Sequence, residues 1–378
     1  MALENHDQLQ QEIDLSRKDM RTQGYSMSIG EWMSLFEKDE ILISPEFQRY
    51  FRWTLMQKTR LIESVLLGIP IPPIYVFQRP ADDRWEVIDG LQRLSTIFQF
   101  AGLMPAPKDM ANGANGALRL LGTEFLPSLE GRAFEDENPE KSFNTQQRLI
   151  FKRAKLDVVI IERESSEEAK YHLFERLNTG GSQLTEQEVR NSVLSMINPP
   201  FLARLDQWSE YGPFLDTVRL SDRQLIEQYD KELLLRFLLL RHATAEDLKG
   251  MKDIGDYLMD RMRQTAENRD FDLDLEEEHF KATFDVLNDA IAGDAFRKYS
   301  ADDDRFSRGF SISAYEVIAI GIGRNLLNGK PIPPPEEIIG LIKDVWKDET
   351  FLDRSGAGKR STERIPHLIP LGERLFSR

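Results

Sequence analysis

Cysteine is absent from the 378 residues of this sequence. Disulfide bonds, thiolate nucleophiles and cysteine-ligated zinc or iron–sulfur sites are therefore excluded. No apolar run is long enough to cross a membrane, and the polar, acidic start of the chain has no apolar core of the kind found in signal peptides. These features predict a cytoplasmic protein that does not bind a membrane.

Histidine is scarce, and none of the five histidines stands at a metal-ligand spacing such as H-E-x-x-H. We interpret each as a surface or core-edge residue. The segment SGAGKRST, residues 355–362, lacks the first glycine of a phosphate-binding loop, and Arg360 replaces the Ser or Thr that should follow the lysine. We interpret this segment as a basic surface loop, so neither a His-based nuclease site nor a complete phosphate-binding loop is present.

Acidic residues exceed basic ones, 64 to 49, which gives a net charge of −15. Proteins that bind long nucleic acid over a broad surface are usually basic, so contact with DNA would need a local patch or a partner chain. The nearest candidate for such a patch is the short cluster of Arg354, Lys359 and Arg360, which acidic residues flank. A single nucleotide, in contrast, needs only a few arginines and backbone amides.

Hydrophobic periodicity divides the chain into a mixed first part and a helical second part. Residues 1–25 are charged, and we interpret them as a flexible lead-in. Thr54 and Gln57 form a capping box that begins a helix, and Gly68 ends it. The other elements expected in the first part are helices at 28–40, 91–100, 165–178 and 184–197, and strands at 41–44, 73–77, 85–89 and 156–163.

These patterns predict an α+β domain with a small mixed sheet over residues 26–200, followed by a mostly helical domain over residues 201–378. The sequence NPP at 198–200 marks the expected boundary between them. In the helical part, residues 225–242 are apolar around most of the helix circumference, which predicts a central, buried helix.

The first candidate site is the sequence VIDGLQR, in which a predicted strand passes directly into a predicted helix. Gly90 permits the tight turn, the first amides of the helix favour an anion, and Arg93 adds a forked positive charge. Asp89 could cap the helix, hold Arg93 or bind a metal, and Gln48 and Arg49 could converge on the same point. The simpler interpretation is a capping Asp, a turn Gly and a surface Arg.

The second candidate site is the segment FERLNTGGSQLTEQEVRNS, residues 174–192. A predicted helix ends at Asn178, and two glycines follow that phosphates could approach closely. Glu175 and Asn178 are three residues apart and share a helical face, where they could hold a hydrated Mg²⁺. The alternative is a C-capping Asn followed by a Gly-rich connector.

Four motifs occur together and in order: P-x-FQR-x-x-x-W, LLGIPIPPI, VIDGLQRLSTI and FERLNTGGSQLTEQEVRNS. In this combination, residues 29 to about 200 resemble the N-terminal domain of the GmrSD-type restriction endonucleases, whose signature is DGQQR. That family is similar in fold to the ParB and sulfiredoxin group. The resemblance therefore implies a ParB/sulfiredoxin-like domain.

The resemblance also implies site residues. Gly90 and Arg93 match the glycine and arginine that hold nucleotide phosphate in the related group. Glu175 and Asn178 match, more loosely, the residues that reach the nucleotide and its Mg²⁺. The candidates for supporting the phosphate are Gln48 and Arg49, and those for positioning a metal or water are Asp89 and Gln92.

The implied function is binding and Mg²⁺-dependent hydrolysis of a nucleoside triphosphate, which gates restriction of foreign, often modified DNA in bacterial or phage-related defence. Two departures bear on it. Leu91 stands where the family signature has its first glutamine, and the C-terminal half shows no His-Asn-His arrangement like that of the fused nuclease forms. DNA cutting would thus require a separate nuclease chain or the N-terminal domain itself, or would not occur.

Two alternatives of other classes remain. The domain could be a DNA-binding or nicking module without triphosphatase activity, because the same phosphate site can hold a DNA backbone. It could also be a regulatory subunit that binds nucleotide without hydrolysing it. The sequence leaves the oligomeric state open, including a homo-oligomer.

Overall fold

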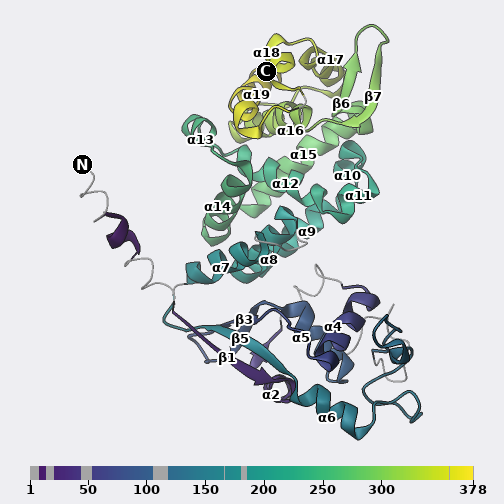
Figure 1. Ribbon diagram of the computed structural model, residues 1–378. Coiled ribbons are helices and arrows are strands. Elements are labelled where there is room, and N and C mark those ends of the chain that lie inside the picture. Colours follow the sequence, from purple (N-terminus) through teal and green to yellow (C-terminus); the bar gives the residue numbers. More distant parts are fainter. Residues whose placement is uncertain are drawn as a thin grey trace. The chain divides into compact units, whose positions relative to one another are not determined.

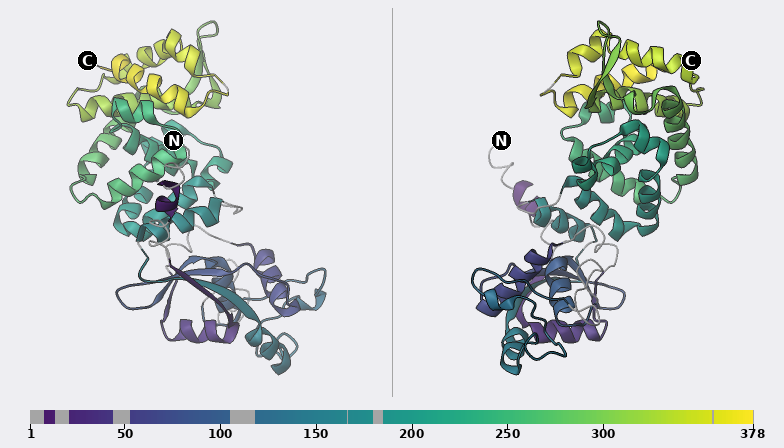
Figure 2. Two further views of the ribbon diagram at one scale, coloured as in Figure 1. Left: turned by 60° about the vertical axis from the view of Figure 1, so that its left-hand side comes forward. Right: turned by 90° about the vertical axis from the view of Figure 1, so that its right-hand side faces the viewer.

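The protein is described by a computed structural model that covers residues 8–13, 21–43, 53–104, 118–165, 167–179, 185–356 and 358–377. The chain divides into two compact units, Met1–Gln183 and Leu184–Arg378 (Figures 1 and 2). The first unit combines a sheet with helices, and the second is mostly helical. This architecture confirms the predicted α+β class with a mostly helical C-terminal part.

A five-stranded mixed sheet forms the centre of the first unit, in the order β1-β5-β3-β4-β2. The outer strand β1 is antiparallel to β5, β5 is parallel to β3, and β3 and β4 form the predicted antiparallel hairpin. The short strand β2 is parallel to β4 at the opposite edge. The strands are β1 (Thr22–Ser28), β2 (Ile41–Leu42), β3 (Ile74–Gln78), β4 (Trp85–Asp89) and β5 (Lys155–Ile161).

Three helices of the first unit begin at a capping box, of which the sequence predicted the one at Thr54; helix α6 was not expected. The side chains of Ser28, Thr54 and Asn144 each accept a hydrogen bond from the backbone N–H at the third helical position, and the side chain at that position accepts one from the backbone N–H of the capping residue. Helices α2, α4, α5 and α6 share one hydrophobic core with the sheet. The helices are α2 (Ile29–Glu37), α4 (Leu55–Leu67), α5 (Leu91–Phe100), α6 (Thr145–Arg153), α7 (Glu167–Thr179) and the 3₁₀ turn η2 (Pro127–Leu129).

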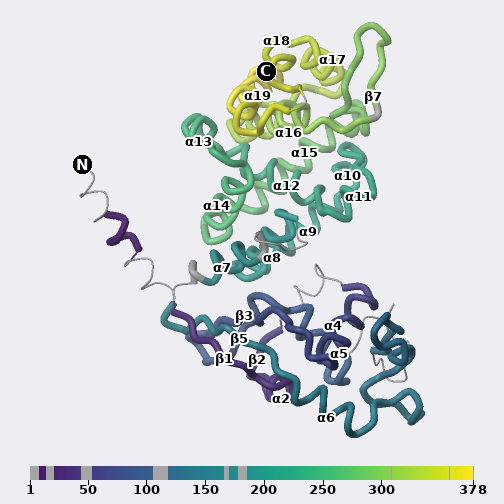
Figure 3. The backbone as a smooth tube through the Cα atoms, viewed as in Figure 1, coloured from purple at the N-terminus to yellow at the C-terminus, as the bar shows by residue number. Residues whose placement is uncertain are grey.

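Strand β1 was missed by the sequence analysis, which extended the flexible lead-in to residue 25. The strand runs beside β5, with Tyr25 opposite Val158 (Figure 3). Its first five residues are exposed, so they show no alternation of apolar and polar side chains that would indicate a strand. The pairing with β5, more than a hundred residues later in the chain, creates this strand.

The second unit packs its helices around the strongly apolar helix α12, in which every residue from Leu233 to Leu240 is buried. This confirms the predicted central helix, although Gln228, with φ of 57°, separates it from the short helix α11. The helices are α8 (Glu186–Ile197), α9 (Pro199–Ser209), α10 (Gly212–Val218), α11 (Asp222–Ile226), α12 (Tyr229–Leu240), α13 (Ala245–Gly250), α14 (Ile254–Glu267), α15 (Leu273–Ile291), α16 (Ile312–Leu327), α17 (Pro335–Val345), α18 (Glu349–Arg354) and α19 (Ser361–Leu375).

A two-stranded antiparallel sheet of β6 (Arg297–Ser300) and β7 (Arg305–Phe310) lies between α15 and α16, and the 3₁₀ turn η3 (Ala292–Asp294) precedes it. This hairpin was not expected from the sequence. At residues 198–200, where the sequence suggested a boundary, Asn198 ends α8 and caps α9, and both helices belong to the second unit. None of the helices in the described ranges is long and apolar enough to span a bilayer.

Candidate phosphate-binding site

The junction between β4 and α5 places an uncapped helix start at the end of a central strand. Gly90 is the N-cap of α5 and has φ of 95°, in the left-handed region that favours glycine. The first bond within the helix is donated by the Leu94 N–H to the Gly90 carbonyl, at 3.0 Å. A side chain at Gly90 would also collide with Cδ1 of Ile74 in β3. The backbone conformation therefore favours glycine here, and an added side chain would also have to displace the end of the Ile74 side chain.

The start of α5 has the properties of an anion site. Among the described residues, no side chain caps it. The amides of the first turn precede the first intrahelical bond, and the helix dipole gives this end a partial positive charge. The geometry therefore agrees with the predicted phosphate contact, which stays a prediction.

Arg93 lies in the first turn of α5 and is held on two sides. Its Nη1 donates hydrogen bonds to the carbonyl oxygens of Pro72 and Pro73, the latter at 3.0 Å, and its Nη2 donates to Oδ2 of Asp89. The side chain is only 11% exposed. Of the five N–H donors of a guanidinium, these bonds use three. The motif LLGIPIPPI did not reveal from the sequence that the proline carbonyls bind Arg93.

Asp89 does not cap the helix, because Gly90 occupies the N-cap position. Of the three roles considered for its carboxylate, the structure shows the ion pair with Arg93. Gln92 accepts a hydrogen bond from the backbone N–H of Trp53, at 3.3 Å, and so links α5 to the residue that precedes the Thr54 cap of α4. Catalytic roles for Asp89 and Gln92 stay predictions.

The structure does not test whether the remaining predicted site residues reach this group. Gln48 and Arg49 lie outside the described residues. Glu175 is in α7 with its side chain 32% exposed, and its Oε2 lies 4.0 Å from Nδ1 of His172. Asn178 belongs to the same helix, and its side chain lies outside the described part. The described residues contain no group of three or more Asp, Glu or His side chains that could hold a metal.

A comparison with protein families shows to which family the first part of the chain belongs. Residues 33–195 match the family model described as GmrSD restriction endonuclease, N-terminal domain. Residues 33–195 belong to that family. The match confirms the resemblance carried by the four motifs and places the chain among the components of GmrSD-type restriction endonuclease systems. A comparison with curated proteins found no significant match.

Within this GmrSD N-terminal domain, α7 is tied to the strand that carries the site. Nζ of Lys170 lies 2.6 Å from Oε2 of Glu86 in β4, three residues before Asp89. The ammonium group also lies over the ring of Phe77 in β3, 5.4 Å from its centroid. The Lys170 side chain is 8% exposed. No sequence pattern indicates this pair, because a single lysine in a charged helix normally indicates a solvated face.

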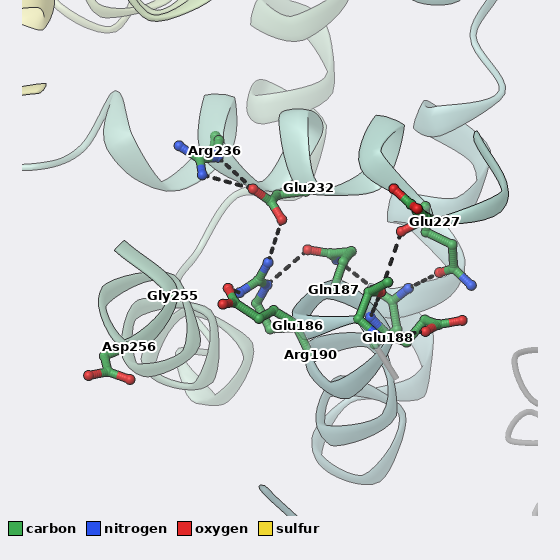
Figure 4. A network of polar contacts seen from close by, with 12 residues as sticks. Glu186, Gln187, Glu188, Arg190, Glu227, Glu232, Arg236, Gly255 and Asp256 are labelled. Carbon is green, nitrogen blue, oxygen red and sulfur yellow. Dashed lines mark hydrogen bonds and ion pairs between the residues drawn. The ribbon is translucent and has the colours of Figure 1, made fainter. Parts of the chain in front are cut away.

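The last part of the GmrSD match ends within α8, which belongs to the second unit. There the motif residues form a buried polar network (Figure 4). Arg190, 2% exposed, donates through Nε to Gln187 at 2.9 Å and through Nη2 to Glu232 of α12 at 2.8 Å. Burial lowers the pKa of Arg190, although Glu232 and Glu186 oppose that shift.

The network continues from Glu232 through the second unit. Both Glu232 and Glu316 bind Arg236, and Glu316 also accepts two hydrogen bonds from Arg364 of α19, at 2.7 and 3.0 Å. Burial disfavours the charge on Arg236, but the two carboxylates outweigh it and raise its pKa. The segment LTEQEVRNS therefore contributes to packing in the second unit, a role that sequence reasoning had not considered.

Proposed function

We propose that the GmrSD N-terminal domain binds a nucleoside triphosphate through its phosphates at the start of α5 and hydrolyses it with Mg²⁺. One observation carries the proposal: Gly90 opens an uncapped helix start, and Arg93 is fixed beside it. Backbone amides, a helix dipole and a guanidinium form the donor set that phosphate oxygens require.

The residues present fit a nucleotide better than a tightly bound metal. Mg²⁺ usually enters such sites together with phosphates and uses only one or two protein carboxylates. Glu175 and Asn178 are the proposed protein contacts of the ion. Bound Mg²⁺ would neutralise charge on the phosphates and help to orient them for attack by water. Gln48 and Arg49 complete the proposed phosphate contacts.

We further propose that nucleotide binding regulates restriction of DNA in the cytoplasm. The C-terminal half lacks a His-Asn-His nuclease arrangement, so the proposal assigns cutting to a separate nuclease chain. The net charge of −15 disfavours a broad DNA-binding surface on this chain, which agrees with DNA cutting by a separate chain. A homo-oligomer is compatible with the proposal, and sedimentation of the purified chain would test it.

The test is phosphate release with each of the four ribonucleoside triphosphates, with and without Mg²⁺, for wild type, Arg93→Ala and the control Arg84→Ala. Arg84 pairs with Asp82 in the β3–β4 turn and is 40% exposed, so its loss removes the same charge away from the site. We expect Mg²⁺-dependent release that only Arg93→Ala abolishes.

Other results would favour the alternatives. Nucleotide binding without phosphate release would indicate the regulatory subunit that does not hydrolyse. DNA binding with a steep salt dependence, lost in Arg93→Ala and insensitive to added nucleotide, would indicate a DNA-backbone site instead. Equal activity in wild type and a folded Arg93→Ala variant would contradict the assignment of the site.

A further inference from the structure

We propose that Asp89 is a positioning residue, which acts by holding Arg93 against the carbonyls of Pro72 and Pro73 and not by binding metal or activating water. This inference rests on the proposed phosphate site and assigns a role within it. It changes the catalytic role expected for Asp89 from the sequence.

The geometry around Arg93 supports this role. The guanidinium has acceptors on both of its terminal nitrogens: two carbonyl oxygens at Nη1 and the Asp89 carboxylate at Nη2. The acceptors come from two different segments, the loop that leads into β3 and the end of β4. Arg93 is thus fixed before any ligand arrives. Such preorganisation favours binding because less side-chain motion is lost when the ligand binds.

The two prolines explain why backbone carbonyls serve this purpose. Pro72 and Pro73 have no N–H group and a fixed φ, so the segment cannot donate to a sheet ladder. Their carbonyls lie before the first residue of β3, Ile74, and are available as acceptors for Arg93. The same Ile74 packs against Gly90. The proline segment therefore supports both the helix start and the arginine.

Two substitutions at Asp89 separate positioning from direct chemistry. Asp89→Asn keeps an oxygen that can accept from Nη2, whereas Asp89→Ala removes the acceptor. Both remove the same negative charge, so a difference between them does not reflect charge alone. A general base, in contrast, would be lost in both variants alike, and EDTA in the buffer excludes a contribution from a bound divalent metal.

The binding experiment uses inorganic tripolyphosphate as the probe, in buffer with EDTA, and isothermal titration of the full chain. We expect Asp89→Ala to bind about tenfold more weakly than Asp89→Asn, as loss of one fixed side chain implies. Arg93→Ala should bind least. Equal affinities of the two Asp89 variants, or Asp89→Ala binding as tightly as wild type, would overturn the positioning role.

A second readout needs no ligand. Rotation of a guanidinium held at both terminal nitrogens is slow, so the Arg93 Nη signals of ¹⁵N-arginine-labelled protein should be resolved in wild type and Asp89→Asn. These signals should merge in Asp89→Ala. They are assigned to Arg93 by their absence from the spectrum of Arg93→Ala. Unchanged Arg93 signals in Asp89→Ala would overturn the inference. If wild type binds no tripolyphosphate but the signals behave as expected, the phosphate site is wrong and the positioning of Arg93 stands.

Discussion

Lys170 of α7 and Glu86 of β4 form a nearly buried ion pair, with Nζ 2.6 Å from Oε2. The two residues are 84 positions apart, and the pair fixes α7 to the strand that ends at Asp89. The segment proposed to contact Mg²⁺ is therefore anchored to the sheet one to two helical turns before Glu175.

Removing Lys170 should destabilise the first unit. Lys170→Ala leaves the Glu86 carboxylate, 21% exposed, without its cation, and we expect a loss of about 2 kcal/mol in the free energy of unfolding. Urea denaturation measures this. The double variant Lys170→Met with Glu86→Leu should recover most of the loss, because it removes both charges. A loss below about 0.5 kcal/mol for Lys170→Ala would place the pair among ordinary surface ion pairs.

Gly90→Ala should be more harmful than the same change at Gly68. Both glycines have positive φ, but nothing lies within 4 Å of a side chain at Gly68, whereas Ile74 blocks one at Gly90. We expect Gly68→Ala to cost about 1 kcal/mol from the backbone alone and Gly90→Ala at least twice that. Thermal denaturation of both variants gives the comparison. Equal costs would show that Ile74 moves aside without strain.

The buried network of the second unit should be sensitive to a single substitution that removes one charge. Glu316 is fully buried between Arg236 and Arg364, so Glu316→Gln leaves two buried guanidinium groups short of one negative charge. We expect Glu316→Gln to lower the free energy of unfolding by about 3 kcal/mol. Arg223→Ala is the control. The Arg223 side chain is 87% exposed, so its ion pair with Glu227 should contribute almost nothing to stability. Comparable losses in both variants would contradict the importance of burial.

Stability of the second unit should fall as the solution is acidified from pH 7 to 5. Burial and the nearby Arg241 lower the pKa of His279, so the folded state binds this proton less readily than the unfolded state does. Stability is thus complete above the unfolded pKa of about 6.5 and decreases below it. His279→Gln should reduce the pH dependence of the urea midpoint in this range while changing little at pH 8. An unchanged pH dependence would assign the effect to other groups.

Glu276 should add to the same trend at lower pH. Burial raises the pKa of its carboxyl, but the hydrogen bond to His242 and the charge of Arg241 outweigh burial and lower it. A carboxyl with a lowered folded pKa stabilises the protein above its unfolded pKa and loses that contribution as pH falls through the folded value. Glu276→Gln should therefore reduce the dependence of the urea midpoint on pH between about pH 5 and 3. An unaltered slope in that range would contradict the role of this carboxyl.

The candidate site shows how far sequence reasoning reached. The turn at Gly90, the helix that follows it and the nearness of Asp89 to Arg93 were all accessible, because they depend on residues within five positions. The sequence also shows that Leu91 replaces the first glutamine of the family signature. That Leu91 packs against the hydrophobic core of the first unit is not visible from the sequence, since the pattern of α5 alone does not say what covers its first turn.

Sequence alone determined the local structure of this protein. The capping box at Thr54, the left-handed glycines at 68 and 90, and the apolar helix α12 follow from short-range sterics and periodicity. Tertiary structure alone decided which polar groups became partners. Arg93 with the proline carbonyls, Lys170 with Glu86, Arg190 with Glu232 and strand β1 with β5 all join residues 20 or more positions apart. Such pairs form only when folding excludes water and leaves each buried charge or backbone group to find its acceptor within the protein.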